Sequence, residues 1–280
     1  SLSGSTSAPT IAKQIMVSDR DRHIIAFGCD PEANPGVQDP LVIRFSSQES
    51  LTDWATTAAN TAGELRLGSG SEIVSAVETR QQILVYTDES LYAMQFLGPP
   101  FTFGVNLVSE NITTMGPLSA VAVEDNVFWM GLKEFYVYGG TVQRLPCSVR
   151  DFVFDDFNLL QREKIVAATN TAFSEIWWFY PSASSDDNDR YVVYNYEQKV
   201  WYYGSLARSF WMDRGIFDNP IAAGPNNYLY TQESGFDDDG SALTAYIESS
   251  QLDIGDGEQF AFIRRMIPDL TFRGSTAGSP

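Results

Sequence analysis

The sequence predicts an all-β fold: a β-propeller of four-stranded antiparallel meander blades, with a further β region at the C-terminal end. Two observations predict it. One stretch reads as a complete four-stranded meander, and its central pattern returns along the chain at intervals close to one blade. The alternative left open is an ordinary β-sandwich, whose strands recur about every 8–12 residues.

The meander is "SAVAVEDNVFWMGLKEFYVYGGTVQRL", from Ser119 to Leu145. Its breaks "EDN", "GLKE" and "GG" have the composition of hairpin turns, and the runs between them are apolar and rich in β-formers. We therefore expect four short antiparallel strands, at Ala120–Val123, Val127–Met130, Phe135–Tyr138 and Val142–Leu145.

A second copy of the meander's centre lies earlier in the chain. "ILVYTDESLYAM" (Ile83–Met94) lies over "VFWMGLKEFYVY" (Val127–Tyr138) without a gap, at an offset of 127 − 83 = 44 residues. Each copy follows an "AVE", at Ala76–Glu78 and Ala122–Glu124, there offset by 46 residues. A gapless copy with a shared flanking motif favours the propeller over the sandwich.

The pattern returns as "IIAFG" from Ile24, "IWWF" from Ile176 and "YLYTQESG" from Tyr228. Five inner-strand cores thus begin near positions 24, 83, 127, 176 and 228, with steps of 59, 44, 49 and 52 residues. Propeller blades span about 40–50 residues, so we expect five or more of them. Turn-rich insertions account for the longer steps: Pro31–Pro40, Thr56–Ser71 and Pro181–Asp189.

Two tryptophans stand side by side, Trp177 and Trp178. Neighbouring side chains of a strand point to opposite faces, so both faces must be covered or one ring is exposed. Neighbouring blades cover an inner strand on both faces, and we interpret the pair as blade-to-blade packing. The later "WYYG" (Trp201–Gly204) ends a strand. For these residues, an exposed aromatic platform on which a sugar could stack remains an alternative to packing.

Little else departs from the β pattern. "DDFNLLQREKIV" (Asp155–Val166) predicts a short helix with an aspartate N-cap that crosses between blades. We predict the propeller blades in residues 1–235, and the last propeller strand and the start of a second β region in residues 236–280. The final "STAGSP" completes no element, so we expect a longer protein, and the opening "SLSGSTSAPT" predicts a flexible lead-in rather than a signal peptide.

The composition excludes several classes of protein. A net charge of −18 over 280 residues repels a phosphate backbone, so tight nucleic-acid binding is not expected, whereas DNA passing along an acidic wall is compatible with it. The one histidine, His23, lies at the start of an apolar run and is interpreted as a strand-end residue.

Cys29 and Cys147 are too few for a disulfide scaffold, and whether they pair stays open. No apolar run approaches the roughly 20 residues of a membrane helix, so we expect no membrane anchor.

Four acidic clusters are candidate sites: Asp155–Asp156, Asp186–Asp189, Asp237–Asp239 and Asp253/Asp256/Glu258. A glycosidase needs a carboxylate pair, but these residues lie in turn-like stretches and are interpreted as solvated turn residues. "GFDDDGS" lacks the alternating aspartates of a calcium loop, and no catalytic or nucleotide-binding motif occurs. We predict no catalytic, cofactor-binding or metal-binding residue, no cofactor, and no enzymatic activity.

Three longer phrases resemble a known family. They are "GPLSAVAVEDNVFWMGLKEFYVYGG", "SEIWWFYPSASSDDNDRYVVYNYEQKVWYYG" and "IESSQLDIGDGEQFAFIRRMIPDLTFRGS". They resemble the tail nozzle proteins of short-tailed bacteriophages, also called tail tubular protein B or tail stabilization protein. The resemblance runs from about Ile73 to Ser275 and contains no catalytic motif.

The resemblance implies a structural protein of the virion, in the phage tail, assembled in the host cytoplasm. Six copies would form the nozzle ring through which DNA is ejected, below the portal and the tail adaptor protein, with tail fibre or spike proteins attached. Two other functions stay open for a propeller: a carbohydrate-binding module that uses Trp201–Tyr203, and a glycoside hydrolase that uses a carboxylate pair.

Overall fold

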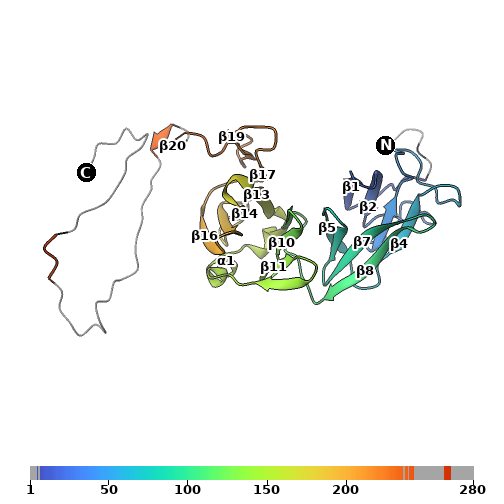
Figure 1. Cartoon of the computed structure of the whole chain (residues 1–280), viewed down its shortest axis with the longest axis horizontal. Helices are drawn as coiled ribbons and strands as arrows, with labels where there is room; N and C mark the ends of the chain where they lie inside the picture. The colour runs from blue at the N-terminus through green and yellow to red at the C-terminus, as the bar shows by residue number, and fades with distance from the viewer. Residues whose placement is uncertain (1–4, 6, 236, 239, 243–261, 266–280) are drawn as a thin grey trace. The chain divides into compact units, whose positions relative to one another are not determined.

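The computed structural model describes residues 5, 7–235, 237–238, 240–242 and 262–265. The chain divides into two units, Ser1–Gln232 and Glu233–Pro280. In the first unit, consecutive strands form four four-stranded antiparallel sheets and then one three-stranded sheet (Figure 1). This architecture is a β-propeller in which each sheet is one blade, as the sequence predicts.

The blades follow one another in chain order. Blade 1 contains β1 (Gln14–Ser18), β2 (His23–Phe27), β3 (Val42–Phe45) and β4 (Gly63–Arg66). Blade 2 contains β5 (Ile73–Glu78), β6 (Ile83–Thr87), β7 (Ser90–Gly98) and β8 (Thr102–Glu110). Blade 3 contains β9 (Ala120–Val123), β10 (Asn126–Met130), β11 (Phe135–Tyr138) and β12 (Val142–Leu145). Blade 4 contains β13 (Val166–Asn170), β14 (Glu175–Tyr180), β15 (Arg190–Asn195) and β16 (Val200–Ser205). Blade 5 contains β17 (Phe210–Met212), β18 (Ile221–Ala223) and β19 (Leu229–Thr231).

The first strands of neighbouring blades lie against one another: β1 contacts β5, β5 contacts β9, β9 contacts β13, and β13 contacts β17. They are therefore the innermost strands. The predicted inner-strand cores at positions 24, 83, 127 and 176 fall on the second strands, which have a neighbouring strand on each side. A second strand has a strand on each side and a blade on each face, which is why β6 is buried at every residue and carries the strongest apolar signal.

One apolar cluster fills each junction between consecutive blades. The junction of blades 3 and 4 contains Trp178, whose ring centroid lies 5.0 Å from that of Phe135 and whose indole nitrogen donates to the Ser119 carbonyl. Trp177 points the other way and stacks on Trp211 of blade 5, at 5.3 Å and 12° between planes. The interpretation of the tryptophan pair as blade-to-blade packing is confirmed.

The predicted gapless copy is confirmed strand by strand. Ile83 pairs with Met94 in blade 2 as Val127 pairs with Tyr138 in blade 3, and both hairpins keep this register to their turns. The shared "AVE" is not equivalent, however. Ala76 lies opposite Val85, whereas Ala122 lies opposite Val127, the counterpart of Ile83. The turn between β5 and β6 of blade 2 is two residues longer than the turn between β9 and β10 of blade 3. The pairing register therefore shifts by two residues, which keeps each side chain on the same face of the sheet.

The fifth copy of the pattern was misplaced. Tyr228 precedes the third strand of blade 5, and the second strand is Ile221–Ala223 instead. Its three residues, "IAA", are few and two of them have small side chains, so their apolar pattern is weaker than that of the "YLYT" that follows. The predicted blade count of five or more agrees with the five sheets of the first unit.

A strap, residues 7–12, covers the face of blade 1 that points away from blade 2. Ala8 and Ala12 pack there with the buried Trp54 and Val42. Asp30 ties the strap down, because its carboxylate accepts hydrogen bonds from the Thr10 and Ile11 amides at 2.9 Å each and from the Thr10 hydroxyl.

The segment between blades 3 and 4 contains two short helices, α1 (Arg150–Asp155) and η1 (Leu159–Lys164). The predicted crossing is confirmed, but the predicted aspartate cap and the single helix are wrong. Asn158 caps η1 by accepting from the Leu160 amide, while Asp156 contacts the Arg190 guanidinium at 3.3 Å. A third short helix, η2 (Thr171–Phe173), lies between β13 and β14.

The second unit is described over few residues. Its short hairpin pairs β20 (Asp237–Asp238) with β21 (Ser241–Ala242). Most of the predicted second β region lies outside the described residues, so that prediction and the predicted boundary after residue 235 stay predictions.

Candidate functional site

The turns that join first and second strands of neighbouring blades lie beside one another, and side chains bridge them at two junctions. Between blades 1 and 2, the Arg20 guanidinium donates to the Arg80 carbonyl at 2.8 Å. Between blades 4 and 5, the Asp213 carboxylate accepts from the Thr171 amide at 3.0 Å and from the Thr169 hydroxyl at 3.1 Å. The two central junctions instead contain pockets.

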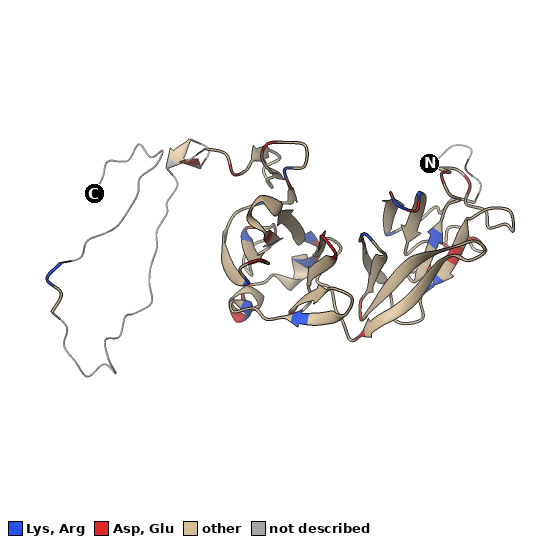
Figure 2. Ribbon diagram, in the orientation of Figure 1, with Lys and Arg blue, Asp and Glu red and all other residues tan. Residues whose placement is uncertain are grey.

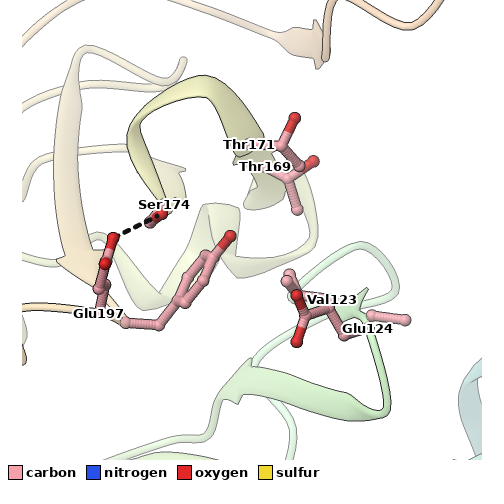
Figure 3. A pocket seen from close by; sticks show the side chains of 8 residues that line it. Val123, Glu124, Thr169, Thr171, Ser174 and Glu197 are labelled. Carbon is pink, nitrogen blue, oxygen red and sulfur yellow. Dashed lines mark hydrogen bonds between the residues drawn. The ribbon is translucent and has the colours of Figure 1, made fainter.

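The pocket between blades 3 and 4 has a volume of about 580 Å³. Figure 3 shows Glu197 and Ser174 on one side of it, Thr169 and Thr171 on a second side, and Val123 and Glu124 on a third. The Ser174 hydroxyl donates to the Glu197 carboxylate at 3.3 Å. Ala122 and Tyr196 complete the lining, which contains two carboxylates, four hydroxyls and no cationic side chain.

The pocket between blades 2 and 3 is smaller, about 410 Å³, and more strongly hydrogen-bonded. The Gln95 amide donates to the buried Gln82 at 2.9 Å, and Gln82 donates to the Tyr138 hydroxyl at 2.7 Å. Arg80 and Asp125 approach each other only loosely on the exposed rim, at 3.9 Å. These hydrogen bonds link β7 and the turn before β6 in blade 2 to β11 in blade 3.

Trp201–Tyr203, the aromatic platform that the sequence left open for carbohydrate binding, mostly packs inside the protein. The Trp201 indole donates to the Pro146 carbonyl at 2.8 Å, and its ring lies 4.6 Å from Phe135. Tyr202 donates to Glu175 and packs against the cluster of blades 4 and 5. Only Tyr203 stays about half exposed, with its ring 4.1 Å from Phe152.

The acidic clusters do not converge on one site in the described part of the chain. Asp189 accepts from the Ser182 amide and hydroxyl at 2.7 and 2.8 Å, and Asp187 contacts the Lys164 ammonium at 2.8 Å. Asp237 accepts from the Gly240 amide within its own turn. These carboxylates stabilise turns, whereas Asp239, Asp253, Asp256 and Glu258 lie outside the described residues.

His23 and Cys29 are buried, and Cys147 is partly exposed. The His23 ring is 1% exposed, with Nδ1 2.6 Å from the Asp21 carbonyl, and burial lowers its pKa. The interpretation of His23 as a strand-end residue is confirmed. Cys29 and Cys147 are both free thiols, and burial raises their pKa values to about 12 and about 11. A thiolate at either position is therefore disfavoured at neutral pH.

No group of three or more histidine, cysteine or acidic side chains suited to a metal ion occurs within the described ranges. Among the described helices, none combines the length and apolar character needed to cross a bilayer. Glu124 and Glu197 share one pocket although 197 − 124 = 73 residues separate them, and no sequence pattern relates the two. Only the packing of blade 3 on blade 4 brings them together.

Comparison with known proteins leaves the family open. No protein-family model matches the chain, and no curated protein matches it. Solved structures similar to it include Hsv2 of Kluyveromyces lactis, with 12% identity and a TM-score of 0.46 over 83% of this chain and 65% of that one. Hsv2 of Kluyveromyces marxianus has 10% identity and a TM-score of 0.45 over 82% and 64%. The N-terminal domain of Nup159 has 8% identity and a TM-score of 0.37 over 85% and 79%.

These similarities are loose and say nothing about what this chain binds. The chain spans less than two thirds of the length of both Hsv2 chains.

Proposed function

We propose that this protein is a structural component of a phage tail, part of the nozzle ring through which DNA leaves the virion. In this role it is not an enzyme. Its partners are further copies of itself, in the ring of six that the family resemblance implies, together with the tail adaptor and the tail fibres or spikes. The single observation that carries the proposal is the resemblance of three sequence phrases to tail nozzle proteins, a resemblance that runs from about Ile73 to Ser275.

The distribution of charge supports this proposal. Figure 2 shows acidic and basic residues mostly at turns and strand ends, while the strands between them are largely uncharged. The net charge of −18 makes the molecule as a whole repel a polyanion such as DNA. A duct for DNA must not bind its cargo, and like charge keeps a duplex away from the wall.

The use of the aromatic residues gives further support. The large rings of Trp129, Trp177 and Trp178 lie inside blade junctions, where they stiffen the stack, and are not presented for ligand stacking. Offset and edge-to-face ring pairs of this kind add roughly 0.5–1.5 kcal/mol each beyond their area burial. A rigid scaffold is what a mechanical part of a virion requires.

Co-purification tests the proposal. The full protein is mixed with the tail adaptor of the same phage, and the complex is measured by gel filtration with light scattering. We expect a complex whose mass corresponds to several copies of this chain on the adaptor. A protein that elutes as a free monomer beside the adaptor at every ratio contradicts the proposal.

A second candidate function is carbohydrate binding, favoured by the pocket between blades 3 and 4. Its carboxylates and hydroxyls match the hydrogen-bonding needs of sugar hydroxyls, and its volume of about 580 Å³ suits a small oligosaccharide. A glycan array with the wild type and Glu197→Gln tests this. Binding that Glu197→Gln abolishes favours a lectin, and an array without any signal leaves the nozzle proposal as the better account.

A further inference from the structure

The pocket between blades 2 and 3 is lined by polar side chains and glycine. Of its ten lining residues, eight have a polar side chain and the other two are Gly139 and Gly140. Most small-molecule pockets are lined mainly by hydrophobic side chains, with a few polar groups among them. This pocket therefore suits a ligand with polar groups over most of its surface.

The charges of the pocket favour a neutral ligand. Arg80 and Asp125 are the two charged residues of the lining, and their formal charges cancel. Both lie on the rim, with side chains 72% and 63% exposed, so the interior presents amides and hydroxyls. An anion would approach a chain whose net charge is −18, and a cation would meet the Arg80 guanidinium.

The inner wall of the pocket is already ordered by the protein. Gln82 and Tyr138 are each 8% exposed, and the hydrogen bonds from Gln95 to Gln82 and from Gln82 to Tyr138 hold them in place. Among the described residues, the Tyr138 hydroxyl proton has no acceptor, and the Gln95 carboxamide oxygen has no donor. The two ends of this series of hydrogen bonds thus offer a donor and an acceptor to a ligand.

Two further carboxamides of the lining are available. The side chains of Gln81 and Asn126 form no hydrogen bond with any residue that the structure describes. Each carboxamide has two donors and an acceptor. The Asn126 carboxamide lies against Gly139, where an added Cβ would be 2.4 Å from its Oδ1. Glycine at this position therefore leaves the space that the carboxamide occupies.

We propose that this pocket binds a neutral hexose unit. A sugar hydroxyl both donates and accepts, as the lining does, and a volume of about 410 Å³ lies within the usual range for small-molecule sites, roughly 300–1,000 Å³. A peptide offers similar main-chain groups, but this lining has no apolar subsite for its side chains. The proposal goes beyond the nozzle role. It concerns a different site from the pocket between blades 3 and 4, whose lining contains two carboxylates.

Isothermal titration calorimetry tests the site on the full chain. The probes are free glucose, galactose and mannose, disaccharides of these sugars, and neutral polysaccharides built from them. We expect at least one probe to bind in the millimolar range or tighter. Binding of a free hexose supports a site for a single unit, and binding of a polysaccharide alone supports a site for the end of a glycan chain.

Two variants connect the binding to this pocket. Asn126→Ala should weaken the affinity by about tenfold or more, because a carboxamide that contacts the sugar is lost. Gly139→Ala should do the same, because its methyl group displaces the Asn126 carboxamide. Neither change removes a side-chain hydrogen bond within the described part of the protein, so both should keep the circular dichroism spectrum and the Tm of the wild type.

Gln143→Ala is the matched control. It removes an exposed carboxamide from β12 of the same blade, outside the pocket, and should bind the sugar as the wild type does.

The inference is overturned by a wild type that binds none of the probes, or by Asn126→Ala and Gly139→Ala binding as tightly as the wild type. It is also overturned by an uncharged peptide, acetyl-triglycine amide, that binds where the sugars do not. Binding that only Glu197→Gln abolishes would assign the sugar to the pocket between blades 3 and 4 instead. Assembly with the tail adaptor is measured separately, so failure of this site leaves the nozzle proposal standing, and failure of assembly leaves this site standing.

Discussion

At the scale of single residues, two tyrosines in one junction differ in how their hydroxyls are satisfied. Tyr86 and Tyr138 both belong to the cluster between blades 2 and 3. The Tyr138 hydroxyl accepts from Gln82 at 2.7 Å, whereas the Tyr86 hydroxyl has no hydrogen-bond partner among the residues that the structure describes. Burial raises the pKa of Tyr86 well above its usual range, so the group stays neutral.

The two tyrosines should therefore respond differently to loss of the hydroxyl. Tyr86→Phe should leave the free energy of unfolding unchanged or raise it by up to about 1 kcal/mol, because a buried unsatisfied group is removed. Tyr138→Phe should lower it by about 1–2 kcal/mol, because the buried Gln82 amide loses its acceptor. Urea denaturation measures both. A Tyr86→Phe variant that is the less stable of the two contradicts this description of the junction.

The carboxylate of Asp30 should make stability depend on acid pH. Burial raises its pKa, but hydrogen bonds from the Gly36 and Ile11 amides and from Thr10 outweigh burial and lower it to about 2. A carboxyl whose pKa is lower in the folded state contributes stability above its unfolded pKa near 3.8, and that contribution is lost as the pH falls toward 2.

The variant Asp30→Asn should remove this contribution. Its free energy of unfolding should be lower than that of the wild type by roughly 2 kcal/mol at pH 7. The difference should shrink between about pH 4 and pH 2, as measured by urea denaturation over that range. A constant difference across these pH values would show that the carboxylate charge is not the cause.

At the scale of elements, the strands were more predictable from sequence than the site. The strand boundaries in blade 3 follow from alternating apolar runs and turn residues, and the copy in blade 2 kept its register. The core of blade 5 was placed near Tyr228 instead of at its second strand, β18, because the apolar run "IAA" of β18 is short. The pocket of Glu124 and Glu197 had no sequence signal, because it exists only where two blades meet.

The junction of blades 3 and 4 should be sensitive to one substitution in particular. Trp178→Ala should lower the free energy of unfolding by about 3–5 kcal/mol, since it leaves a cavity and deprives the Ser119 carbonyl of its donor. Tyr228→Ala, at a side chain 68% exposed, should change it by less than about 0.5 kcal/mol. Equal effects in chemical denaturation would refute the assigned packing.

At the scale of the whole molecule, charge predicts how the protein treats DNA. With 36 acidic and 18 basic side chains, its net charge of −18 repels the phosphates of a duplex and opposes the contacts that would release counterions. We expect no retardation of a short DNA duplex in a gel shift at about 150 mM salt, and none at low salt, where electrostatic binding is strongest. Retardation that increases as the salt concentration is lowered would contradict this prediction. It would show that part of the surface is basic although the net charge of the protein is negative.

Several copies of this propeller, we propose, form a ring around a duct for DNA. The most direct measurement is electron microscopy of the full protein bound to the tail adaptor of the same phage. We expect closed rings of several copies with a central opening. Separate, single propellers scattered beside the adaptor would contradict it.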